Sequence, residues 1–196
     1  RSRGKTFWKG KELTSGLCLH TSLLIDGVWH DSSQAAWEVK QVDKAELVVV
    51  GYWPYLPIFQ TWKLAVLNSN SIFWEINMEV CEKVNITLGQ TNLMISSQFK
   101  SWQAPGFSEG VFSDEYFKSY DILPFRFWSG SVKEISASGN NLPSIIFRNQ
   151  EKSPKVQAVV ENTDALYEAR LLQYQNFFNT AILPGKYGYF KGVIEI

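Results

Sequence analysis

The chain has only two histidines in its 196 residues, and both lie near its start. Cys18 and His20 are two positions apart, which would place them on one face of a β-strand, and His30 follows across an Asp26-Gly27 turn. Thiolate and imidazole are ligands that zinc prefers, and a histidine is the usual base for a serine or cysteine nucleophile. The pattern matches no established zinc spacing, so we predict no metal site here.

Other motifs for catalysis or cofactor binding are absent from the sequence. It contains no G-x-S-x-G elbow, no phosphate loop and no dinucleotide fingerprint. Glu75 and Glu79 would share a strand face but stand ~13 Å apart at ~3.3 Å per residue, too far for a glycosidase pair. We therefore predict no cofactor and no catalytic residue. An enzyme that uses loop carboxylates with His20 or His30 is kept as an alternative.

Aromatic residues are the unusual component, with 8 Trp, 8 Tyr and 13 Phe. We expect most of them in the core, and one or two tryptophans exposed to stack on flat ligands such as sugar rings. Residues 100–128 combine aromatic and acidic side chains without clear periodicity. A loop of this length is functional or disordered, and its aromatic content argues against disorder. We predict an ordered excursion over a sheet, with Trp102, Asp114, Tyr116 and Trp128 as ligand-binding residues.

Charge and hydropathy exclude several classes of partner. Nineteen basic residues balance nineteen acidic ones, and like charges do not cluster, so we expect no nucleic acid partner. No apolar run approaches the ~18 residues of a spanning helix, so we expect no membrane insertion. The two cysteines, Cys18 and Cys81, cannot make a disulfide framework, and we expect buried free thiols.

The clearest element is a long β-hairpin over residues 58–80. In its second arm, apolar residues take every other position from Ile72 to Val80, with Glu75, Asn77 and Glu79 between them. This period of two indicates a strand with one buried face and one solvated face. The link at residues 68–71, Asn-Ser-Asn-Ser, is made of turn formers.

About a dozen shorter strands are predicted along the rest of the chain, with at most one short helix. Residues 166–178 fit a helix capped by Asp164 or a strand, and the all-β surroundings favour the strand. The sequence therefore predicts one all-β domain over residues 1–196, a two-layer antiparallel β-sandwich, with the aromatic excursion at 100–128.

Three segments resemble galactose mutarotase-like β-supersandwich domains. The run from Ser131 to Phe147 is similar to their strand, glycine turn and Leu-Pro strand start, and residues 165–196 are similar to their closing strands. The hairpin from Trp62 to Val80 also fits their long strands. Enzymes of that group use a mid-chain histidine, and here no histidine follows His30.

The resemblance therefore implies a non-catalytic, carbohydrate-associated domain that binds a polysaccharide, fused to or associated with a catalytic module. Aromatic rings would stack on sugar rings while carboxylates and amides hold hydroxyl groups. Two alternatives stay open: a structural or interaction domain of a larger protein, and a carbohydrate-active hydrolase, lyase or epimerase.

Overall fold

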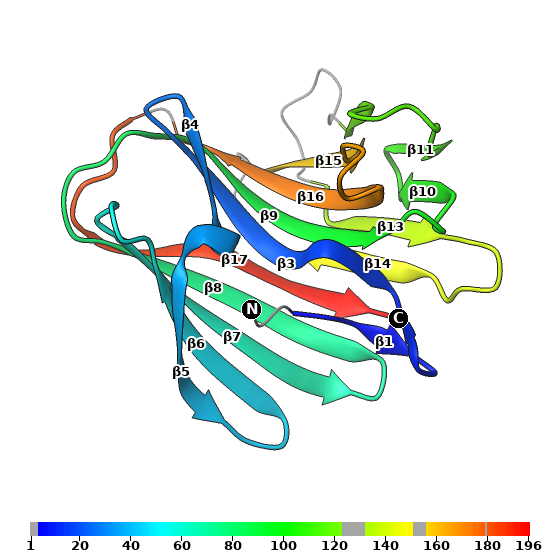
Figure 1. Cartoon of the computed structure of the whole chain (residues 1–196), viewed down its shortest axis with the longest axis horizontal. Coiled ribbons are helices and arrows are strands. Elements are labelled where there is room, and N and C mark those ends of the chain that lie inside the picture. Colours follow the sequence, from blue (N-terminus) through cyan, green and yellow to red (C-terminus); the bar gives the residue numbers. More distant parts are fainter. Residues whose placement is uncertain (1–3, 123–131, 151–155, 179) are drawn as a thin grey trace.

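The computed structural model consists of antiparallel β-strands and describes residues 4–122, 132–150, 156–178 and 180–196 (Figure 1). Two sheets pack face to face as a sandwich, which confirms the predicted fold class. The larger sheet has nine strands, in the order β11 (Ser108–Val111), β10 (Ser101–Ala104), β13 (Glu134–Ser138), β14 (Ile145–Asn149), β17 (Gly185–Glu195), β8 (Ser71–Val80), β7 (Ile58–Asn68), β6 (Glu46–Tyr52) and β5 (Ala36–Val42).

The smaller sheet is narrower by three strands. Its order is β12 (Ser119–Ile122), β15 (Val156–Asn162), β16 (Ala169–Phe177), β9 (Ile86–Ser96), β3 (Thr14–Ile25) and β4 (Val28–Asp31). A short 3₁₀ turn, η1 (Ser32–Gln34), leads from β4 into β5 at the edge of the larger sheet and is the only helical element in the described ranges. In Figure 1 the strands β5, β6 and β7 lie at the end of the larger sheet away from β9, β16 and β15.

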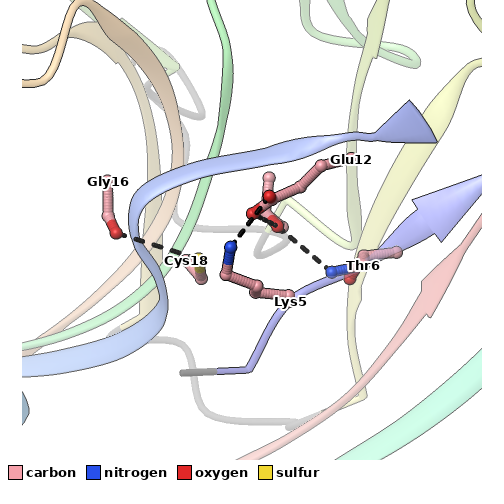
Figure 2. Close-up of polar contacts among 6 residues, drawn as sticks. Lys5, Thr6, Glu12, Gly16 and Cys18 are labelled. Carbon is pink, nitrogen blue, oxygen red and sulfur yellow. Dashed lines mark hydrogen bonds and ion pairs between the residues drawn. The ribbon is translucent and has the colours of Figure 1, made fainter. Parts of the chain in front are cut away.

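A small hairpin of β1 (Phe7–Trp8) and β2 (Lys11–Glu12) precedes the smaller sheet. Figure 2 shows two polar contacts here: the Thr6 amide donates to Thr14 Oγ1 of β3 at 3.1 Å, and Lys5 pairs with Glu12 of β2 at 2.9 Å, which closes the hairpin itself. Trp8 then packs against the buried core.

Aromatic rings fill the centre between the sheets. Trp74 contacts Trp62, Phe147 and Phe190 with ring centroids 5.0, 6.3 and 5.6 Å away, and Tyr174 of the smaller sheet lies 5.0 Å from Phe147. Aromatic pairs at such separations contribute ~0.5–1.5 kcal/mol each beyond their buried area. In the described ranges ten aromatic side chains are buried in the core and eleven are exposed, so the expectation that most aromatic residues lie in the core is met only in part.

Each sheet also sends a buried tyrosine to the opposite backbone. Tyr174 of β16 donates to the Phe147 carbonyl at 2.9 Å, and Tyr189 of β17 donates to the Gln90 carbonyl at 3.0 Å. Burial raises the pKa of both hydroxyls. These bonds satisfy polar groups that would be costly to bury alone, and they fix how the sheets lie across each other.

Local turn chemistry is as the sequence predicts. Asp26 and Gly27 have positive φ values of 48° and 80°, which suit a two-residue hairpin between β3 and β4. The arms of the central hairpin, β7 and β8, are joined at Ser69 and Asn70, and the Asn70 amide donates to Asn68 Oδ1 at 2.8 Å.

Residues 166–178 hold the strand β16, which confirms the strand in preference to the helix. Asp164 does act as a cap, because its Oδ1 accepts the amides of Leu166 and Tyr167 at 3.1 Å each. It caps a turn that leads into the strand.

Residues 100–122, the described part of the predicted excursion, hold three short strands and are not one long loop. The strands β10 and β11 form a hairpin at one edge of the larger sheet, with Gly106 at φ 79° in the connection, and β12 lies at an edge of the smaller sheet. Strands of four residues show too few alternations to stand out in a sequence, and their pairing depends on distant partners. The segment therefore leads from the larger sheet to the smaller one and adds strands to both.

Both cysteines are free thiols, but Cys18 is buried and Cys81 is exposed, so the expected burial is correct for Cys18 alone. Within the described ranges, no helix has the length and apolar character needed to span a bilayer.

Candidate functional site

Two of the four predicted ligand-binding residues have no exposed side chain that the structure describes. Trp102 on β10 is only 6% exposed and belongs to the continuous core. Its ring lies over Gly110 of the neighbouring strand, where an added Cβ would stand 2.8 Å from Cζ2. A ring buried in this way offers no face to a sugar. Trp128 lies outside the described residues.

The other two, Asp114 and Tyr116, are exposed in the loop between β11 and β12. Tyr116 is 52% exposed, and its hydroxyl donates to Glu168 Oε1 at 3.3 Å. Below them, the buried Asn162 donates from Nδ2 to the Glu115 carbonyl at 2.7 Å. The loop is therefore ordered and fixed to the smaller sheet, but Asp114 and Tyr116 are not brought together with Trp102.

His20 and His30 lie on opposite faces of the smaller sheet. His30 pairs with Leu23, which faces the core, whereas His20 lies on the opposite face of β3. His20 is buried, and burial lowers its pKa, while the Cys18 carbonyl and the charge of Asp31 oppose that change. No group of three potential metal ligands gathers in the ranges that the structure describes.

A row of exposed side chains crosses four strands on the solvent-facing side of the larger sheet. Tyr52 of β6 stands opposite Phe59 of β7, Phe59 opposite Glu79 of β8, and Glu79 opposite Lys186 of β17. The two rings have centroids 6.1 Å apart at an angle of 37°, and Lys186 Nζ lies 3.8 Å from Glu79 Oε2. With strands ~4.8 Å apart, the row is about 14 Å long.

A second row adjoins the first and supplies an amide. Asn77 stands between Thr61 of β7 and Gly188 of β17, two positions along the strand from Glu79. At Gly188 an added Cβ would meet nothing within 4 Å, so the surface beside Asn77 is open. We call the surface formed by Tyr52, Phe59, Asn77, Glu79 and Lys186 the aromatic platform.

The platform combines the groups that a polar ligand with apolar faces requires. Tyr52 and Phe59 are 43% and 39% exposed, so part of each ring faces solvent. Asn77 has two donors and an acceptor, Glu79 has acceptors, and Lys186 has donors. All of them extend from paired strands, which position side chains more firmly than free loops do.

Sequence reasoning placed Asn77 and Glu79 correctly on the solvated face of the central hairpin, but missed the other platform residues. The alternation around Phe59 marks that ring as outward-facing and was a usable signal. The proximity of Tyr52 and Lys186 depends on pairing between strands that are distant in the chain, which local patterns do not report.

Comparison with known proteins gives structural matches alone. No protein-family model and no curated protein matches the sequence. Among solved structures, the GH36 alpha-galactosidase AgaB of Geobacillus stearothermophilus is similar with a TM-score of 0.58 and 10% identity, covering 92% of this chain and 30% of that one. A variant of alpha-galactosidase AgaA from the same organism, in complex with 1-deoxygalactonojirimycin, gives a TM-score of 0.58 and 9% identity over 97% and 31% of the two chains.

The galactosidase domain of the alpha-galactosidase-sucrose kinase AgaSK is similar with a TM-score of 0.54 and 9% identity, covering 94% of this chain and 31% of that one. The chain thus spans about 30% of the length of the galactosidase chains that it resembles. At 9–10% identity, the shared property is the fold.

Proposed function

We propose that the chain is a non-catalytic, carbohydrate-associated β-sandwich domain of the galactose mutarotase-like type that binds glycan on the aromatic platform. The observation that carries the proposal is the direct cross-strand succession of Tyr52, Phe59, Glu79 and Lys186 on an open sheet face. The rings of Tyr52 and Phe59 stack on the C–H faces of a sugar, and the neighbouring carboxylate and amide hold its hydroxyl groups.

The fold gives the proposal independent support. The similar solved structures are alpha-galactosidases, proteins named for action on galactosides, and this fold forms about a third of each chain. A domain of this kind that lacks a mid-chain histidine fits an accessory role beside a catalytic module. Asp114 and Tyr116, on their anchored loop, are the competing location for glycan binding, and the test below compares the two surfaces.

Binding to a panel of neutral and anionic polysaccharides, measured by glycan array and calorimetry, tests the proposal. We expect Tyr52→Ala or Phe59→Ala to weaken binding of the best glycan at least about tenfold, or ~1.4 kcal/mol. Tyr116→Ala tests the competing loop, because it removes the exposed aromatic ring there. Circular dichroism confirms that each variant keeps its strands.

Three outcomes are informative. Loss of binding in the platform variants alone supports the proposal as stated. Loss in the Tyr116→Ala variant alone moves the glycan site to the loop. If the wild-type chain binds no polysaccharide in the panel, the carbohydrate-binding role is wrong.

A second candidate function, a domain that docks against another domain of a longer protein, rests on a different surface. The core-facing side of the larger sheet continues past the smaller sheet along β5–β7, and there it exposes apolar side chains. Val39, Val42 and Val66 are 58%, 68% and 54% exposed on this side. Exposed apolar patches of this kind commonly mark interaction sites.

Hydrogen exchange distinguishes this second function. In a longer polypeptide that contains the chain, the amides of β5 would exchange more slowly than in the isolated chain if a neighbouring domain covers that edge. Equal exchange of residues 36–42 in both contexts would exclude docking there.

A further inference from the structure

We infer that the glycan bound on the aromatic platform is uncharged, and is neither a uronate-containing nor a sulfated polymer. This inference rests on the proposed function and narrows it to a ligand class. It comes from the way the basic side chains on and around the platform are paired.

Every basic residue on the strands β5–β8, β14 and β17 is paired with a glutamate. On the platform, Lys186 pairs with Glu79 at 3.8 Å. The surrounding pairs are Lys40 with Glu38 at 2.6 Å, Lys63 with Glu46 at 2.6 Å, Lys191 with Glu75 at 3.9 Å, and Arg148 with Glu134 at 2.7 Å and with Glu195.

The resulting charge balance disfavours an anionic ligand. Counting Glu134 of the adjacent strand β13, five basic side chains are paired with six glutamates, so these ion-paired side chains together carry a small net negative charge. A ligand carboxylate that took Lys186 would only exchange one carboxylate partner for another, and it would leave Glu79 beside it without its partner. Like charges this close repel each other, even when solvent weakens the effect.

A neutral sugar meets no such obstacle. Its hydroxyl groups can donate to Glu79 and accept from Asn77 while the existing ion pair stays in place. Its C–H faces need only the exposed rings of Tyr52 and Phe59. Because no new charge pair forms, binding should be almost independent of salt.

The test measures calorimetric affinity of the whole chain for galactomannan and xyloglucan as neutral probes, and for polygalacturonate and heparin as anionic ones. Each titration is run in about 20 mM sodium chloride, where charges are weakly screened, and in about 500 mM, where they are strongly screened. We expect binding to a neutral probe that changes less than about twofold with salt, and no binding to the anionic probes.

A gain-of-binding variant makes the test sharper. Glu79→Gln leaves Lys186 without its partner and brings the basic and acidic residues to equal numbers. We expect this variant, unlike the wild type, to bind polygalacturonate in 20 mM salt and to lose that binding in 500 mM salt.

The failure of this inference can be told from the failure of the proposed function. If the wild type binds an anionic probe in a salt-sensitive way, and Tyr52→Ala abolishes that binding, the platform is a glycan site but the inference is wrong. If no probe binds at all, the proposed function fails, and the inference fails with it. Neutral binding that Tyr52→Ala leaves intact would also overturn the inference, because the glycan would then lie elsewhere.

Discussion

The two edges of the larger sheet repeat one arrangement with different outcomes. On β5, Trp37 lies over Gly51 of the neighbouring strand, where an added Cβ would stand 2.7 Å from Cη2. On β10, Trp102 lies over Gly110, where an added Cβ would stand 2.8 Å from Cζ2. In each case the missing side chain of glycine lets an indole ring rest directly on the backbone of the next strand.

The rings differ in what covers their other side. Trp102 is 6% exposed and shares the buried core with Phe112, whereas Trp37 is 37% exposed and is followed along the inner face by the exposed Val39 and Val42. The smaller sheet is three strands narrower, and it leaves the β5 edge uncovered. Burial of a sheet residue therefore depends on the opposite layer as much as on the strand that carries it.

The largest expected effect is on stability. Trp102→Ala should lower the free energy of unfolding by ~3–5 kcal/mol, because it removes a large buried ring and leaves a cavity. Trp37→Ala should cost about 1–2 kcal/mol, because much of that ring already contacts water. Urea denaturation of the two variants measures the difference. Equal losses would show that Trp37 is as well covered as Trp102.

The two glycines give a smaller and more specific contrast. Gly110→Ala forces a methyl group against a ring that has no space to move, and we expect a loss of ~1–3 kcal/mol. Gly51→Ala creates the same clash with Trp37, but that ring is partly exposed and can move toward solvent by giving up its hydrogen bond to the Ser32 carbonyl, so we expect the smaller loss. Near-ultraviolet circular dichroism should change more for Gly51→Ala, since its tryptophan relocates. A larger stability loss for Gly51→Ala would contradict this account.

The contrast between Trp37 and Trp102 also shows which features could be predicted from the sequence. The central hairpin, the Asp26-Gly27 turn and the strand after Asp164 were predictable, because their periodicity and turn residues lie within a few positions of each other. Trp37 and Trp102 carry no such signal. Which of them is covered depends on how two sheets of unequal width align, and that alignment is built from contacts between distant segments.

The prediction that Trp102 binds a ligand fails for a related reason. The stretch 100–128 lacks alternation, which predicts one surface excursion, yet Trp102 lies in the four-residue strand β10, between β13 and the edge strand β11, and is buried in the core. The platform residues lie on ordinary strands that carry no local sequence signal of a site. Tyr52, Phe59 and Lys186 adjoin only once β6, β7, β8 and β17 are in register.

Acid provides a control that should act equally on both edges. Burial lowers the pKa of His20 on the smaller sheet below its ordinary value of 6.5, with Asp31 and the Cys18 carbonyl opposing. Above pH 6.5 both folded and unfolded chains carry the neutral ring. Below it the unfolded chain binds a proton first, so the free energy of unfolding should fall with pH until the folded chain is protonated as well.

This pH dependence is measured by urea denaturation between about pH 7.5 and 5.5, where few carboxylates titrate. His20→Gln should flatten the profile. The difference in stability between Trp102→Ala and Trp37→Ala should stay constant over this range, because both rings belong to the larger sheet, whereas His20 lies on the outer face of the smaller sheet. A difference that changes with pH would show that one edge is coupled to the histidine.

The smallest expected effect is spectroscopic and needs almost no change in stability. Trp37→Phe should reduce the fraction of tryptophan emission that iodide quenches, because it removes one of the exposed rings. Trp102→Phe should instead raise that fraction, because it removes emission that iodide does not quench, and the exposed Trp29 contributes equally in both variants. Trp37 lies on the core-facing side of the larger sheet and the aromatic platform on the other, so a bound glycan should not protect Trp37 from iodide. If a saturating glycan does protect it, the sugar binds at the uncovered β5 edge, and that edge, previously assigned to domain contacts, is the carbohydrate site.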